Sequence, residues 1–148
     1  MESPAANPSA LQIPAPRRVA PRTLIASLWL FAILNYVYCD ILGLYWADHL
    51  NALLAGAFGG MAITQEFLLG SAVLMSIPIA STLIARIAPH GFARWASVAA
   101  GVVMTLVQAA SLTVGDGPTL HYIYFSVIEI ATTAFIAWYA AFRWTAEA

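Results

Sequence analysis

Four apolar runs, each long enough to cross a lipid bilayer, constrain this chain more than any other feature of its sequence. The runs cover residues 23–46, 63–85, about 93–114 and 119–142. At 1.5 Å per residue, a helix of about 20 residues crosses a hydrocarbon core of about 30 Å. Helices satisfy their own backbone hydrogen bonds, so each run is predicted to be helical. We therefore predict an all-α, polytopic membrane protein built as an antiparallel four-helix transmembrane bundle.

The composition agrees with a membrane protein. Only 9% of the residues are charged and the mean hydropathy is +0.80, whereas soluble domains carry about 25% charged residues. Cys39 is the single cysteine, which excludes an internal disulfide, a CxxC redox pair and a cysteine-rich zinc site. The sequence has no basic patch, so nucleic acid is not an expected partner.

The chain is predicted to have one folded domain with a tail at each end. Residues 1–22 contain five prolines and no apolar periodicity, which is typical of a disordered tail, here a cytoplasmic one. Residues 23–144 form the four-span membrane domain. Residues 145–148 form a short cytoplasmic C-terminal tail.

The links between the runs predict how the helices are arranged. Residues 86–92 and 115–118 are short and contain turn residues, so the helices that they join are expected to be antiparallel neighbours. The first link, residues 47–62, is longer and mostly apolar. Its segment "LNALLAGAF" is either a short interfacial or re-entrant helix, with Gly59 and Gly60 turning the chain, or a continuation of a longer, tilted first helix.

The arginines predict the orientation. All six lie on one side of a four-span arrangement: Arg17, Arg18 and Arg22 before the first run, Arg86 and Arg94 around the second link, and Arg143 after the last run. Loops on the other side carry Asp48 and Asp116 and no arginine. Positive charges in short flanking segments stay cytoplasmic. We therefore predict a multi-pass protein of the plasma membrane with both termini in the cytoplasm.

Each run places a polar residue in the outer half of the membrane. Asp40 lies about six residues, or about 9 Å, from the outer end of the first run, and Glu129 lies near the middle of the fourth. The candidate ligand or ion pocket comprises Asn35, Asp40, Glu66, Gln108, His121, Tyr122, Ser126, Glu129 and Thr133. No residue is predicted to be catalytic and none to bind a metal.

Helical spacing supports a shared interior face. Tyr122, Ser126, Glu129 and Thr133 follow the pattern i, i+4, i+7, i+11, which places them on one stripe of the fourth helix. The third run has a similar stripe of Ser97, Gly101, Thr105 and Gln108. In the second run, Glu66 aligns with Gly70 and Ile77. These stripes predict that the polar faces of the helices point inward.

Each polar residue also has a simpler interpretation. Glu66 suits the first turn of a helix, where the helix dipole favours a negative charge. Gln108 suits a hydrogen bond between helices, His121 an interfacial position, and Cys39 a small core position. Glu129 is the hardest to explain in this way. A carboxylate near the bilayer centre costs about 3 kcal/mol or more, so it must be protonated, paired or in contact with a wet cavity.

Three segments carry a resemblance to a known family. They are "HYIYFSVIEIATTAFIAWYAAFRW" (121–144), "ITQEFLLGSAVLMSIPIA" (63–80) and "RWASVAAGVVMTLVQAASL" (94–112). Over about residues 24–144 the chain resembles an uncharacterised, domain-of-unknown-function family of small four-span bacterial membrane proteins. More distantly its layout is similar to DoxX-like four-helix membrane proteins. That second resemblance implies a quinone-linked redox role.

Three functions remain open from the sequence. The first is an outward-facing, acidic intramembrane pocket that binds a small molecule, a cation or a proton. The second is a structural or accessory subunit whose polar residues serve only helix packing, and the third is the quinone-linked redox subunit. An enzyme is not favoured and no cofactor is expected. The expected partners are the lipid bilayer, a small-molecule or cation ligand, and a second copy of the chain or a larger membrane complex.

Overall fold

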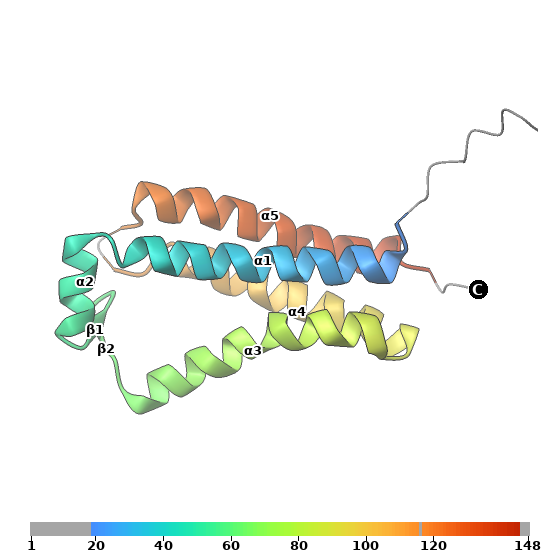
Figure 1. Cartoon of the computed structure of the whole chain (residues 1–148), viewed down its shortest axis with the longest axis horizontal. Coiled ribbons are helices and arrows are strands. Elements are labelled where there is room, and N and C mark those ends of the chain that lie inside the picture. Colours follow the sequence, from blue (N-terminus) through green and yellow to red (C-terminus); the bar gives the residue numbers. More distant parts are fainter. Residues whose placement is uncertain (1–18, 116, 146–148) are drawn as a thin grey trace, which may run out of the picture.

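Helices dominate the computed structural model, which describes residues 19–115 and 117–145. Its elements, labelled in Figure 1, are α1 (Pro21–Gly43), α2 (Ala47–Leu54), β1 (Ala57–Phe58), β2 (Met61–Ala62), α3 (Gln65–Ile87), α4 (His90–Ser111) and α5 (Leu120–Phe142). By length and composition, α1, α3, α4 and α5 are each able to cross a membrane. The predicted all-α membrane fold is confirmed, with one small β-hairpin added.

The four long helices pack around one another. α1 contacts α3 and α5, and α4 contacts the same two helices, with the α4–α5 contact the most extensive. Residues 19–20 and 143–145 lie at one end of the bundle, the termini end, while α2 and the hairpin lie at the other, the α2 end (Figure 1). The short links at 88–89 and 112–119 make α3, α4 and α5 successive antiparallel neighbours.

A glycine sets the distance between α4 and α5. A methyl group at Gly101 would lie 2.8 Å from the Thr133 backbone oxygen and 3.0 Å from Ala137 Cβ. Both distances are below ordinary van der Waals contact, so only glycine fits there without moving α5. Small residues at a helix contact allow this kind of close approach in membranes, where packing rather than water exclusion holds helices together.

The arginines of the termini end bind the last carbonyls of neighbouring helices. Arg22 donates from Nη1 to the backbone oxygens of Ala88, at 2.8 Å, and Ala85, at 3.3 Å, at the end of α3. Arg94 donates from Nε to the oxygen of Ala140, at 2.9 Å, near the end of α5. The last carbonyls of a helix lack partners within it and carry the negative end of the dipole. These two arginines therefore fasten helix ends as well as adding positive charge.

α3 has fully buried residues along only half its length. Its buried residues are Pro78, Ser81 and Ala85, all in the half nearer the termini end. The half that begins at Gln65 has no buried residue and slants away from α1 toward the α2 end (Figure 1). α3 continues through Pro78, although proline removes one backbone hydrogen bond.

The first link contains a short separate helix and a turn at Gly59 and Gly60, as one of its two interpretations predicted, and not a continuation of the first helix. α1 does not run on to residue 46 but ends at Gly43, and a turn leads into the separate helix α2, which starts before "LNALLAGAF" and ends at Leu54. Gly59 and Gly60 do turn the chain, with φ of 53° and 80°. Positive φ at both central residues of a two-residue hairpin is what a type I′ turn requires, so β1 and β2 pair here.

The predicted N-terminal tail is too long by two residues. Pro21 and Arg22 belong to α1, because proline suits the first turn of a helix, where its missing N–H is not needed. Residues 1–18, with Arg17 and Arg18, lie outside the described residues. So do Asp116 and the last three residues of the predicted C-terminal tail.

The close α4–α5 contact predicts that a glycine-to-alanine substitution has opposite effects on stability at two helical glycines. Gly101→Ala should lower the free energy of unfolding by about 1–3 kcal/mol, because the new methyl group overlaps α5. Gly70→Ala is the matched control, since nothing lies within 4 Å of a Cβ there, and it should stabilise α3 by up to about 1 kcal/mol. Detergent-solubilised protein unfolded by heat or by SDS measures both. Equal effects of the two changes would contradict a tight α4–α5 contact.

Candidate functional site

A cavity of about 420 Å³ lies at the α2 end. It is bounded by the ends of α1, α4 and α5, by α2 and the hairpin, and by the link before α5. Its lining residues are Cys39, Asp40, Gly43, Trp46, Asp48, His49, Phe58, Gly59, Met61, Ser111, Val114, Gly115, Gly117, Pro118, Thr119, His121 and Tyr122. A volume of this size lies in the range of small-molecule sites, about 300–1,000 Å³.

Two histidines and a carboxyl group meet beside Gly43. A methyl group on Gly43 would lie 3.6 Å from His49 Nε2 and 4.0 Å from His121 Nε2, so both imidazoles face this glycine. Asp40, three residues earlier on α1, lies within electrostatic range of His49. The Thr119 hydroxyl and His121 Nδ1 are 3.0 Å apart and hydrogen-bonded, which helps to fix that ring. The side chains therefore come from α1, α2 and α5.

Aromatic rings and glycine contacts form the hairpin side of the cavity. Phe58 packs edge-on against His49, with ring centroids 5.8 Å apart, and lies 6.0 Å from the Phe67 ring. A methyl group on Gly115 would lie 3.3 Å from the Gly59 Cα, so the hairpin turn rests on the link after α4. This contact holds the hairpin over the cavity.

A layer of hydrogen bonds between α4 and α5 lies next to the cavity and extends into the bundle. Tyr122 donates to Ser111 Oγ at 2.6 Å, and the Gln108 amide donates to Ser126 Oγ at 2.8 Å. Further along the same pair of helices, the hydroxyls of Thr105 and Thr133 are 2.8 Å apart. These are side-chain bonds across a helix contact, the kind expected to fix helix packing in a membrane.

Glu129 is buried in this interior with a relative exposure of 1%. Among the described residues, neither of its carboxyl oxygens has a hydrogen-bond partner, and the same is true of the Tyr36 hydroxyl. The Glu129 carboxyl lies within electrostatic range of Tyr36, Cys39 and Asp40 on α1. An unpartnered buried carboxyl group is costly and so marks a place where a proton or a bound group matters.

The structure separates the nine predicted pocket residues into groups. Asp40, His121 and Tyr122 line the cavity. Gln108, Ser126, Glu129 and Thr133 lie in the α4–α5 interior. Asn35 is buried, but its amide donates to the oxygen of Phe31 on its own helix, at 2.8 Å, and it does not line the cavity.

Glu66 does not join the others, and its predicted alignment toward the interior is wrong. Glu66 and Gly70 are exposed, because this half of α3 slants away from α1. The simpler interpretation agrees with the structure. Glu66 lies in the first turn of α3, whose N-cap residue Thr64 accepts a hydrogen bond from the N–H of Phe67 at 3.2 Å.

Several lining residues were not among the predicted ones. Asp48 and His49 lie on α2, in a link whose fold the sequence left open, and Cys39 was interpreted as a core residue. The sequence signal for Asp48 and His49 was that they are adjacent polar residues at the start of an otherwise apolar segment.

Within 19–115 and 117–145, no three His, Cys, Asp or Glu side chains are placed to hold a metal ion.

The fold and the cavity together define a class: a small four-helix membrane protein with an acidic, histidine-lined cavity at one end. The chain belongs to a family described as a family of unknown function, DUF6326, whose model matches residues 18–148. The predicted membership of an uncharacterised family is thereby confirmed, whereas the distant DoxX-like relationship is not shown. No curated protein and no solved structure matches the chain.

The interior hydrogen bonds predict which serines matter for stability. Ser126→Ala should lower the free energy of unfolding by about 1 kcal/mol, because the buried Gln108 amide loses its acceptor. Ser76→Ala is the matched control, since the Ser76 hydroxyl is exposed and bonds only to the Ala72 oxygen of its own helix. SDS unfolding of both variants measures the difference. A loss that is no larger at Ser126 than at Ser76 would contradict the role of this bond.

Proposed function

We propose that the cavity at the α2 end binds a small organic cation with a protonated amine, and that Asp40 is its anionic anchor. The observation that carries the proposal is the position of the Asp40 carboxyl on the wall of a ligand-sized cavity. Binding of a cation there compensates a carboxylate that lies near the end of a membrane helix.

The distribution of charge supports a cationic ligand. Asp40 and Asp48 line the cavity, and none of its described lining residues is an arginine or a lysine. The described arginines lie at the termini end of the bundle: Arg22, Arg86, Arg94 and Arg143. An incoming cation is therefore attracted by the carboxylates without repulsion from a fixed positive charge.

The aromatic side chains support an organic ammonium group over a bare ion. Trp46, Phe58 and Tyr122 line the same cavity as Asp40. The face of an aromatic ring attracts an ammonium group, and apolar walls suit the carbon atoms attached to it. A cavity of about 420 Å³ also exceeds what a single ion needs.

The structural or accessory role remains the second candidate, and a specific set of contacts favours it. The Gln108–Ser126 and Thr105–Thr133 bonds join α4 to α5 and need no ligand to explain them. We assign these four residues to packing. The Asp40, His49 and His121 side chains, by contrast, face a cavity beside Gly43 and not a helix contact.

We also propose that the α2 end faces the outside of the bacterial inner membrane, with the termini in the cytoplasm. The described arginines support this orientation, because positive charges in short flanking segments remain cytoplasmic. In this orientation the cavity receives its ligand from outside the cell.

The anchor role of Asp40 predicts a selective loss of binding. With n-butylamine hydrochloride as the probe, the purified wild-type protein should show a saturable rise in melting temperature. Asp40→Asn should weaken this binding at least tenfold, because the ammonium group loses its charged partner. Glu66→Gln removes an exposed acid outside the cavity and should leave binding unchanged. Thermal shift and isothermal calorimetry provide the measurements.

Two results would overturn the proposed function. One is the absence of any saturable response to n-butylamine in the wild-type protein. The other is an equal loss of affinity in Asp40→Asn and Glu66→Gln, which would indicate attraction by net charge alone. n-Butanol is the neutral control ligand and should give no saturable shift.

The proposed orientation predicts the labelling of two single-cysteine variants. In a Cys39→Ala background, Tyr45→Cys at the α2 end should react with a membrane-impermeant maleimide added to intact cells. Ile87→Cys at the termini end should react only after the membrane is opened. Tyr45 and Ile87 are 82% and 80% exposed, so accessibility within the protein is matched. The reverse labelling pattern would place the cavity in the cytoplasm.

A further inference from the structure

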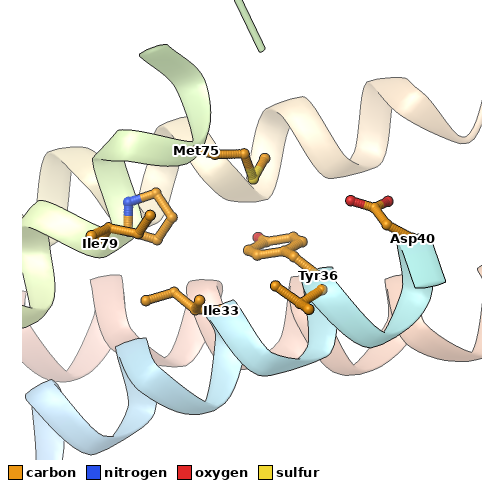
Figure 2. A pocket seen from close by; sticks show the side chains of 7 residues that line it. Ile33, Tyr36, Asp40, Met75 and Ile79 are labelled. Atoms are coloured by element: carbon orange, nitrogen blue, oxygen red, sulfur yellow. The ribbon is translucent and has the colours of Figure 1, made fainter. Parts of the chain in front are cut away.

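A second, smaller cavity of about 110 Å³ lies between α1 and α3, and we call it the α1–α3 cleft. Its lining residues are Ile33, Tyr36, Val37, Asp40, Met75, Pro78 and Ile79. Figure 2 shows the Tyr36 ring and the Asp40 carboxyl pointing from α1 into the space beside Met75 of α3. The walls are apolar except for the Tyr36 hydroxyl and, at the end nearer α2, the Asp40 carboxyl.

The cleft opens toward the side of the bundle that faces lipid. Two of its lining residues, Val37 and Ile79, are 46% and 52% exposed on helices that cross the membrane. α3 has no buried residue before Pro78 and slants away from α1 beyond the cleft (Figure 1). A hydrocarbon chain is therefore able to enter the cleft sideways from the bilayer without crossing a polar surface.

Asp40 connects the cleft to the cavity at the α2 end, because it is the one described residue that lines both. It lies three residues before the end of α1, or about 4.5 Å below it. Ile33 lies seven residues further along, about 10 Å deeper into the membrane. The carboxyl group is therefore near the depth of polar head groups, and the apolar walls of the cleft lie below it.

We propose that the natural ligand is a single-chain amphiphile drawn from the bilayer, with a protonated amine head at Asp40 and the adjoining carbons of its hydrocarbon chain in the α1–α3 cleft. This inference rests on the proposed function and specifies its ligand class. The head group reaches the cavity at the α2 end through Asp40, while the adjoining carbons of the chain lie among Ile33, Met75 and Ile79 and the rest of the chain extends into the bilayer.

Charge complementarity selects this occupant over other amphiphiles. A carboxylate at the end of an apolar cleft attracts a cationic head and repels an anionic one. A neutral head leaves the carboxylate without a charged partner close to the hydrocarbon region, where an unpaired charge is costly. A short soluble amine satisfies Asp40 but leaves the apolar walls unfilled.

The test uses full-length protein in lipid nanodiscs and a dodecylamine probe that carries a diazirine midway along its chain. Photolysis should attach the probe to peptides that contain Met75 or Ile79, and unlabelled dodecylamine should compete. Asp40→Asn should reduce this labelling at least tenfold, because the head group loses its partner. A dodecanol probe with the same diazirine should give only weak labelling that Asp40→Asn does not change.

A pair of tryptophan variants tests the cleft itself. Ile79→Trp fills the cleft from the lipid-facing side and should reduce labelling by the dodecylamine probe at least fivefold. Leu83→Trp lies one turn further along α3, is similarly exposed at 59%, does not line the cleft and should label like the wild-type protein. An unchanged response to n-butylamine shows that Ile79→Trp is folded.

The outcomes separate the inference from the proposed function. If n-butylamine binds at Asp40 but the dodecylamine probe labels the cleft no better than the dodecanol probe, the natural ligand is not an amphiphile held in the cleft. The proposed cation site at Asp40 is then still supported. If Ile79→Trp labels like Leu83→Trp, the chain does not occupy the cleft and the inference fails. If neither amine binds, both proposals fail together.

Discussion

The close contact between α4 and α5 is the interaction on which the rest of the structure depends. Gly101 removes the side chain that would hold these helices apart, so the polar stripes of the two helices meet. The bonds from Gln108 to Ser126 and from Tyr122 to Ser111 then follow along the same line. In a bilayer this packing replaces the exclusion of water as the force that joins helices. It also fixes the ends of α4 and α5, which support the cavity.

α1 and α3 are in contact at one end of the bundle and separate at the other, and this separation creates access to Asp40. Arg22 fastens α1 to the last carbonyls of α3 at the termini end. Toward the α2 end α3 slants away, which leaves the cleft beside Tyr36 and Asp40 (Figure 2). A bundle closed equally at both ends would have buried Asp40 among helices. The open end instead gives this carboxyl two neighbours, the cavity at the α2 end and an apolar cleft.

Much of the fold was predictable because each membrane helix is specified by its own composition. Length and hydropathy identified all four long helices, with ends that differ by at most three residues. The stripe of Tyr122, Ser126, Glu129 and Thr133 was identified by helical spacing, and its last three members are buried. The same reasoning failed for Glu66, because the inward face of a helix is defined only where a neighbour packs against it.

The sequence by itself therefore determined the class of the protein, its family and the helices that carry the polar residues. A helix in lipid forms from local hydrogen bonds and apolar length, and both are properties of a single segment. Only the tertiary structure decided that α2 and the hairpin fold over the helix ends, and that His49 meets His121 beside Gly43. The tertiary structure alone also decided that Asp40 lines both the cavity at the α2 end and the α1–α3 cleft. Those relations depend on distances between separate segments, which helical periodicity within one segment does not specify.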